Sequence, residues 1–124
     1  MGSYLSSSKN REQIDLALAK ANQIISSNPV VVFSKTYCGY CQRVKQLLSQ
    51  LKATYKVIEL DVESDGDYIQ TALAESTGQR TVPNVFIGGK HIGGCDAVVE
   101  KHQQGKLVPM LAEAGAIAKL STQL

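Results

Sequence analysis

The sequence predicts an α/β fold in which a small mixed sheet is flanked by helices. Three observations support this prediction: several segments have apolar residues at helical spacing, short β-branched runs alternate with those segments, and two such runs flank a Gly-Gly pair. The chain has 124 residues, 44% hydrophobic and 19% charged, which is enough to bury one core without metals or disulfides. We therefore expect one domain with a four-stranded sheet.

The first predicted element is an amphipathic helix from about residue 10 to residue 27. Its apolar positions recur at helical spacing. They are Ile14, Ala17, Leu18, Ala21, Ile24 and Ile25. Asn28-Pro29 follows and ends the helix, because proline cannot continue it. The Ser-rich residues 1–9 are expected to be a disordered leader, and residues 10–124 the single folded domain.

The opening of the leader matches the pattern for N-terminal myristoylation, with Gly2 and Ser6 in the required places. The pattern is short, and one acyl chain anchors only weakly. A disordered leader or a cloning remnant explains the same residues. Lipid anchoring is therefore kept as a weaker alternative.

The next three segments predict a strand, a helix and a second strand. Residues 30–33 read Val-Val-Val-Phe, a run typical of a strand covered on both faces. Residues 41–51 carry apolar side chains on one helical face, and residues 55–60 form another β-rich run. Because a strand, a helix and a strand within about 30 residues form a βαβ unit, these two strands should be parallel.

The second half of the chain predicts a helix, a hairpin and two closing helices. The helix after the acidic stretch 61–67 should end at Gly78. Residues 84–87 and 90–92 flank Gly88-Gly89, which favours a tight turn between antiparallel strands. Helices are then expected over residues 96–104, beginning at Asp96, and over residues 106–114.

Charge and composition exclude several classes of protein. A net charge of +2 without any basic run does not favour nucleic-acid binding. No apolar run approaches the roughly 20 residues that span a bilayer. Three cysteines form an odd number, and no secretory signal is evident, which argues against a secreted disulfide scaffold. We therefore expect a soluble, cytoplasmic protein without a transmembrane segment.

Cys38 and Cys41 are the best candidates for catalysis. The motif Cys38-Gly39-Tyr40-Cys41 follows a buried strand directly and lies at the first turn of a helix. Free backbone N–H groups and the positive end of the helix dipole favour a thiolate there, and Lys35 adds a positive charge. The thiolate is the attacking species in disulfide exchange. Cys38 should therefore be the nucleophile, and Cys41 the resolving cysteine.

Three other readings of this pair remain open. Cys38, Cys41 and Cys95 could bind zinc together with His91 or His102. The pair could also form a structural disulfide, although nothing in the sequence indicates secretion. The spacing could finally arise by chance, but C-x-x-C after a strand in a βαβ unit is the usual redox placement.

Four motifs in order resemble the glutaredoxin family. They are Lys35 with Cys38-Gly39-Tyr40-Cys41, Arg80-Thr81-Val82-Pro83, Gly88-Gly89, and Gly93-Gly94-Cys95-Asp96. The resemblance runs from about Pro29 to the last helices, so the first helix lies outside the family core. Thioredoxin, by contrast, has Trp before its first cysteine, and this chain has no Trp. The resemblance implies a thioredoxin-like fold and an enzyme that uses glutathione to reduce glutathionylated proteins and disulfides.

The resemblance also implies a glutathione site. The peptide bond before Pro83 would be cis, so that the backbone of Val82 could pair with the cysteinyl part of glutathione. Lys35 and Arg80 would meet the glycyl carboxylate, helped by Gln70. The remaining contacts are assigned to Tyr40 beside the thiol, to Gly94, and to Cys95 and Asp96 at the γ-glutamyl end.

The motif departs from the commonest family pattern at Gly39, where Pro is usual. In this respect it resembles members that assemble a 2Fe-2S cluster between two subunits, using one active-site cysteine from each and two glutathiones. Thiolate ligation suits such a cluster. The alternative function is therefore a cluster-binding dimer with Cys38 as metal ligand, the apo protein being a monomer. The sequence leaves the role of Cys95 open, and it assigns none to the two histidines.

Overall fold

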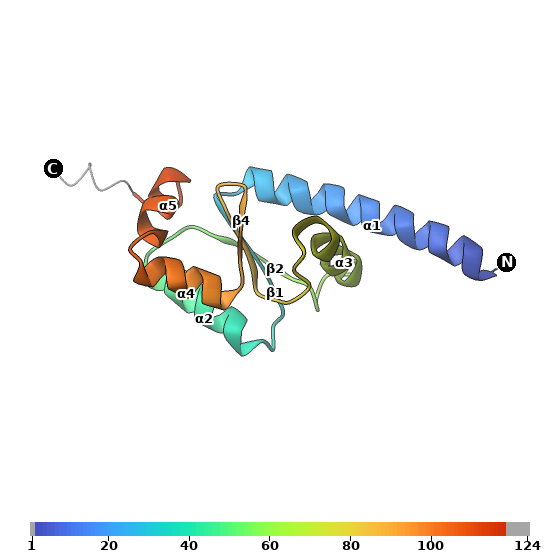
Figure 1. Cartoon of the computed structure of the whole chain (residues 1–124), viewed down its shortest axis with the longest axis horizontal. Helices are drawn as coiled ribbons and strands as arrows, with labels where there is room; N and C mark the ends of the chain where they lie inside the picture. The colour runs from blue at the N-terminus through green and yellow to red at the C-terminus, as the bar shows by residue number, and fades with distance from the viewer. Residues whose placement is uncertain (1, 119–124) are drawn as a thin grey trace.

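The computed structural model describes residues 2–118, with side chains described from Asn10 onward. All the predicted helices and strands are present, and the predicted fold class is confirmed (Figure 1). In chain order the elements are α1 (Gly2–Ser27), β1 (Val30–Ser34), α2 (Gly39–Gln50), β2 (Lys56–Glu59), α3 (Gly66–Thr77), β3 (Asn84–Ile87), β4 (Lys90–Gly93), α4 (Cys95–Gln103) and α5 (Leu107–Glu113).

The four strands form one mixed sheet in the order β2-β1-β3-β4. β1 runs parallel to β2, with Val31 opposite Lys56, and antiparallel to β3, with Val30 opposite Ile87. All five residues of β1 are buried, as expected for the central strand of a sheet covered on both faces. This register decides which loops share an end of the sheet. Cys38 lies beyond the carboxyl end of β1, and the turn between β3 and β4 lies at the other end.

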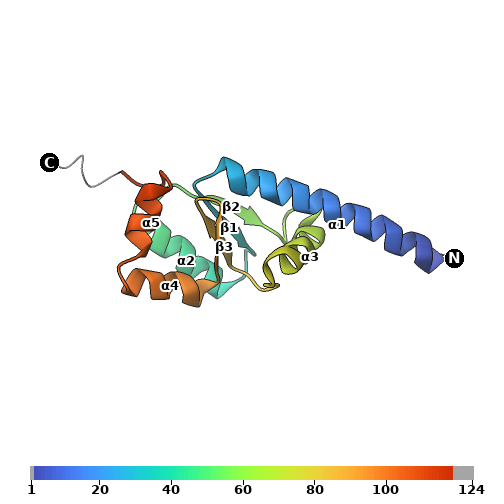
Figure 2. The same cartoon turned by 45° about the horizontal axis from the view of Figure 1, so that its top comes forward.

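Helices cover both faces of the sheet (Figure 2). α1 and α3 lie on one face, where Val31, Phe33 and Phe86 enter a core with residues of both helices. α2, α4 and α5 lie on the other face, over a core that includes Val32 and Val85. Alternate residues of each strand thus serve opposite cores, which is the period-two pattern of a strand. The result is a three-layer sandwich that holds the end of β1 rigidly.

The first helix is longer than the sequence predicts. α1 begins at Gly2, whereas periodicity predicted a start near Asn10 and a disordered leader over residues 1–9. The segment contains no Pro, and its one Gly is at the first helical position, so nothing in it breaks a helix. Figure 1 shows the N-terminal turns of α1 extending past the body of the domain. The myristoylation pattern lies among residues 1–9, whose side chains are outside the described part of the structure. Met1 and residues 119–124 are also outside it.

Two other boundaries differ from the predictions. α2 begins at Gly39, so that Cys38 is its N-cap residue, whereas the apolar pattern shows only the part from Cys41 onward. α4 begins at Cys95 with Gly94 as N-cap, and Asp96 lies in the first turn without capping the helix. Gly94 has the extended backbone that is usual for an N-cap residue, and no side chain caps this helix by a hydrogen bond. Among the described helices, none combines the length and apolarity needed to cross a membrane.

Candidate active site

Cys38 is held at the amino end of α2 by backbone contacts on both sides. Its N–H donates to the carbonyl of Lys35 at 3.1 Å, and its carbonyl accepts from the N–H of Gln42 at 3.2 Å. The sulfur accepts the N–H of Cys41 at 3.4 Å. A sulfur in this position receives a hydrogen bond and the positive end of the helix dipole, both of which stabilise a negative charge. Cys38 is partly exposed, whereas Cys41 and Cys95 are buried.

Cys41 has the opposite environment one turn further along α2. Its side chain is fully buried, and burial is the main cause that raises the pKa of its thiol to about 11, followed by the hydrogen bond with Cys38. Cys41 therefore remains protonated at neutral pH. The motif thus combines a partly exposed Cys38 at the helix N-terminus with a buried, protonated Cys41.

The loop before Cys38 is tied to the end of β2 by a pair that sequence reasoning missed. Asp61 accepts the N–H of Thr36 at 3.0 Å and also the hydroxyl of Thr36. These hydrogen bonds lower the pKa of Asp61, with a smaller contribution from the charge of Lys35. Thr36 and Asp61 are 25 residues apart, and neither belongs to a motif. The parallel pairing of β1 and β2 brings them together.

A groove of about 750 Å³ opens beside Cys38. The peptide bond between Val82 and Pro83 is cis, as the resemblance implied. The sulfur of Cys38 lies 3.8 Å from the carbonyl oxygen of Val82, at the edge of this groove. The groove is lined by Tyr40, Gln79, Thr81, Val82, Pro83, His91, Ile92, Gly93, Gly94, Cys95, Asp96 and Ala97. Its lining residues come from the start of α2, the cis-proline segment, β4 and the start of α4.

Gln79 is a second residue that the sequence did not reveal. Its side-chain amide donates to the carbonyl of Thr81 at 3.1 Å and to that of Pro83 at 2.9 Å. A Cβ built on Gly94 would lie 3.8 Å from the same nitrogen. Gln79 therefore connects the cis-proline segment with the Gly93-Gly94 turn on the facing wall. A single glutamine outside any motif gives no sequence signal for such a role.

The structure brings most of the predicted site residues together around this groove. Tyr40, the Val82–Pro83 pair and the segment 94–96 line it, with Cys38 at its edge. Lys35, Gln70 and Arg80 do not line it. Gln70 instead donates to the carbonyl of Arg80 at 2.8 Å, so its direct contact is with the backbone beside the groove.

The zinc reading has no support in the structure. Cys38, Cys41 and Cys95 are all free thiols. Within residues 2–118, no group of three or more Cys, His, Asp or Glu side chains could hold a metal ion. Cys95 is buried at the start of α4, and burial is the main cause that raises its pKa.

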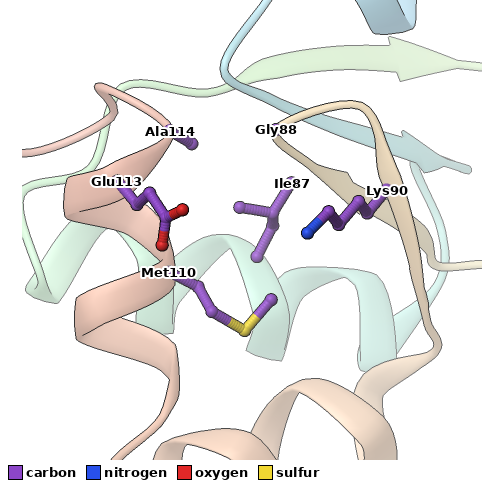
Figure 3. Close-up of a pocket in the computed structure, with 6 residues that line it drawn as sticks. All are labelled: Ile87, Gly88, Lys90, Met110, Glu113 and Ala114. Atoms are coloured by element: carbon purple, nitrogen blue, oxygen red, sulfur yellow. The ribbon is translucent and has the colours of Figure 1, made fainter.

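A smaller pocket of about 180 Å³ lies at the opposite end of the sheet (Figure 3). It is formed between the hairpin and α5, with Lys90 and Glu113 at its sides and Met110 across one wall. Figure 3 shows no thiol among the lining side chains. The pocket therefore offers no group that could carry the chemistry expected at Cys38.

Known proteins share the sequence pattern and the fold of this chain. Residues 30–92, just over half of the chain, match the sequence model of the Glutaredoxin family. Over 125 aligned residues the chain is 65% identical to glutaredoxin-C1 of Arabidopsis thaliana, and the alignment covers 100% of both proteins. The chain belongs to the glutaredoxin family. As a member, it is a glutathione-dependent thiol-disulfide oxidoreductase.

Solved glutaredoxin structures agree with this assignment. Buckwheat glutaredoxin in complex with glutathione is 73% identical and superposes with a TM-score of 0.86, covering 86% of this chain and 97% of that one. The holo form of glutaredoxin C1 from Populus tremula x tremuloides is 66% identical, with a TM-score of 0.82 and coverage of 87% and 97%. Both alignments include most of the domain, so the glutaredoxin fold extends well beyond the motif.

Proposed function

We propose that Cys38 is the catalytic nucleophile for the removal of glutathione from glutathionylated proteins. The Cys38 thiolate attacks the glutathione sulfur, the bond to the target sulfur breaks, and the target leaves as a thiolate with the electron pair. A second glutathione thiolate then attacks the glutathione bound to Cys38, which releases glutathione disulfide and restores the Cys38 thiolate. The observation that carries this proposal is the partly exposed Cys38 sulfur at the helix N-terminus and groove edge.

The groove is proposed to bind glutathione as an extended chain. The backbone of Val82 would pair with the cysteinyl unit, and the amide N–H groups at Cys95 and Asp96, with the Asp96 carboxylate, would hold the γ-glutamyl end. Gly94 would let the ligand approach this wall closely. Support comes from the placement of these residues around one groove and from the glutathione complex of the buckwheat relative.

The other end of glutathione would meet positive charge outside the groove. Lys35 and Arg80 are proposed to attract the glycyl carboxylate, and Tyr40 to border the reacting sulfur. Gln70 would act through Arg80, because its amide holds the Arg80 carbonyl. Its substitution should therefore have a smaller effect than substitution of Arg80.

Cys41 is proposed to resolve mixed disulfides only when a protein disulfide is the substrate. Its burial and its raised pKa of about 11 keep it protonated while Cys38 reacts. In the reaction with glutathionylated proteins, free glutathione takes the place of Cys41. The two reactions should therefore differ in their need for the second cysteine.

The test compares Cys38→Ser and Cys41→Ser on a glutathionylated protein and on a protein disulfide, with glutathione reductase and NADPH reporting turnover. Cys38→Ser should abolish both activities. Cys41→Ser should retain deglutathionylation and lose most disulfide reduction. Loss of deglutathionylation in Cys41→Ser would show that the division of roles is wrong, and activity in Cys38→Ser would remove the nucleophile assignment.

A second proposed function is binding of a 2Fe-2S cluster shared by two chains. Four thiolates are required, and Cys38 is the one cysteine of the three that is not buried. One chain thus offers one surface thiolate, which fits a cluster held by Cys38 of two subunits and two glutathiones. A Cβ at Gly39 would meet no atom within 4 Å beyond its chain neighbours and its own helix, so the motif leaves room at the position after Cys38. Such a protein would serve in the sensing, storage or transfer of iron-sulfur clusters.

Anaerobic purification with glutathione tests this second function. Visible absorption, iron and sulfide content, and molecular mass should be measured on one sample. A coloured dimer with about two irons, lost in Cys38→Ser and retained in Cys41→Ser, would establish the shared cluster. A colourless monomer would contradict it and leave the oxidoreductase alone.

A further inference from the structure

Exposed apolar side chains concentrate around Cys38. Among the described residues, the large hydrophobic side chains that are well exposed are Leu16 (68%), Tyr37 (75%), Tyr40 (59%) and Val62 (68%). Tyr37 and Tyr40 flank Cys38 in the sequence, and Val62 follows the Asp61 that binds Thr36. Leu16 lies apart on α1. Three of the four thus belong to the segments around Cys38: Tyr37 and Tyr40 flank it, and Val62 is joined to the loop before it through Asp61 and Thr36.

Tyr37 and Val62 lie on two loops that one contact joins. Thr36 precedes Tyr37, Asp61 precedes Val62, and Asp61 accepts both the N–H and the hydroxyl of Thr36. The N–H of Val62 also donates to the carbonyl of Glu59 at 3.0 Å. Hydrogen bonds therefore hold the loop backbone next to Tyr37 and at Val62. A fixed apolar surface costs less conformational entropy when a partner binds than a mobile one does.

This surface is separate from the groove proposed for glutathione. Tyr40 lines the groove, whereas Tyr37 and Val62 do not. Glutathione carries two carboxylates and an amine, and it has little apolar surface to place on a tyrosine and a valine. Its occupant should therefore be the other half of the substrate.

The chemistry places a polypeptide close to this surface. In a glutathionylated protein, the target sulfur is joined to the glutathione sulfur by a bond of about 2 Å. When that glutathione sulfur reaches Cys38, the residues next to the target cysteine must lie against the rim of the site. With glutathione in the groove and its glycyl carboxylate at Lys35, Tyr37 and Val62 are the exposed apolar side chains left on this rim.

We propose that Tyr37 and Val62 form a docking surface for apolar residues that flank the target cysteine of a glutathionylated protein. The proposal rests on the function proposed for Cys38 and names a preference within its substrates. Targets with an apolar residue beside the cysteine should react faster than targets with small or polar neighbours. Small glutathione disulfides, which have no flanking chain, should not depend on the surface.

The test uses two synthetic peptides, each glutathionylated at a single cysteine, with Leu on both sides in one and Gly in the other. A third substrate is the mixed disulfide of glutathione and 2-mercaptoethanol. Wild-type protein should show a kcat/KM about tenfold higher for the Leu peptide than for the Gly peptide, as partial burial of a leucine predicts. Val62→Ser and Tyr37→Ser should each reduce this ratio several-fold, and leave turnover of the small disulfide within about twofold.

Leu16→Ser is the matched control, since Leu16 and Val62 have the same exposed fraction and Leu16 is on α1. It should keep the wild-type ratio. Equal rates for the two peptides with wild-type protein would overturn the proposal, and so would a Val62→Ser variant that slows all three substrates alike. Failure of the proposed function is distinguishable, because wild-type protein would then not turn over the small disulfide at all.

Discussion

The two ends of the sheet both carry a pocket, yet they differ in every feature that chemistry needs. The site end has the groove, the amino end of α2 and all three cysteines of the chain. The hairpin end has a smaller pocket with Lys90 and Glu113 at its sides (Figure 3). A hollow surface alone therefore does not identify a reactive site. What distinguishes the site end is a sulfur placed where backbone N–H groups have no other partner.

The largest expected effect concerns the buried thiol of the motif, Cys41. In Cys38→Ser protein, the rate at which iodoacetamide alkylates Cys41 should rise about tenfold per pH unit, or about 1000-fold from pH 7 to pH 10, because only the thiolate reacts. This follows from a pKa of about 11 that burial raises, since burial persists in the variant. Peptide mapping by mass spectrometry distinguishes Cys41 from Cys95. A rate that levels off near pH 8.5 would indicate an ordinary, accessible thiol.

The second effect compares glycines at the two ends. A Cβ on Gly66 would lie 1.8 Å from the carbonyl oxygen of Leu60, so Gly66→Ala must displace backbone beneath the site. We expect a loss of about 3 kcal/mol in the free energy of unfolding, more than 100-fold in the folding equilibrium. At the hairpin end, Gly89 has open space but a φ of +80°, so Gly89→Ala should cost about 1 kcal/mol.

Urea denaturation of both variants measures this difference. Gly39→Ala serves as control, because its Cβ would meet no atom within 4 Å. Equal losses in Gly66→Ala and Gly89→Ala would show that the site end is no more tightly packed than the hairpin end.

The third effect concerns how the walls of the groove are held. Gln79→Met keeps the shape of the side chain but removes the hydrogen bonds to Thr81 and Pro83, each worth about 1 kcal/mol. The KM for a glutathionylated peptide should rise about fivefold to tenfold with kcat nearly unchanged, which is the signature of lost binding. Gln79→Lys retains a donor and should recover part of the loss. Lys90→Met, at the hairpin end, should leave both constants unchanged, and an equal effect there would remove the distinction between the ends.

The smallest expected effect is a pH-dependent one at Asp61. The hydrogen bonds from Thr36 lower its pKa in the folded protein, so the charged carboxylate stabilises the fold. This stabilisation is complete above the unfolded pKa of about 3.9 and is lost as the pH falls through the lowered folded value. Asp61→Asn should therefore be less stable than wild type at pH 7, with the difference vanishing in strong acid.

Urea midpoints at pH 7, 5, 3 and 2 test the Asp61 prediction. In a Thr36→Val background, the pH-dependent loss of stability caused by Asp61→Asn should shrink, because the main cause of the lowered pKa is gone. A loss that persists unchanged at pH 2 would mean that the amide disturbs the loop for reasons other than charge.

Local signals made most of the fold predictable from the sequence. The Val30–Phe33 run marked the buried central strand, Gly88-Gly89 marked the hairpin turn, and Gly78 ends α3 with a φ of +81° as expected. The start of α1 was wrong, because the added turns carry no apolar periodicity and periodicity was the evidence used.

The site was predictable where it consists of a motif and unpredictable where it depends on contacts between loops. Cys38, Tyr40 and the Val82–Pro83 pair belong to recognisable motifs and lie together around the groove. The Thr36–Asp61 contact and the bridge made by Gln79 join residues whose partners depend on strand pairing and loop geometry. Common polar residues of this kind give no pattern in one sequence. Their roles emerge only when the chain is folded.

The open space around Gly39 has a consequence for how this enzyme can change. Beyond its chain neighbours and its own helix, no atom lies within 4 Å of where its Cβ would be, and its φ is outside the region that favours glycine. The residue next to Cys38 is thus free of tertiary packing. A replacement there should alter the surroundings of the sulfur at little cost in stability. A substitution at this position can therefore change the reactivity of the Cys38 sulfur without changing the fold.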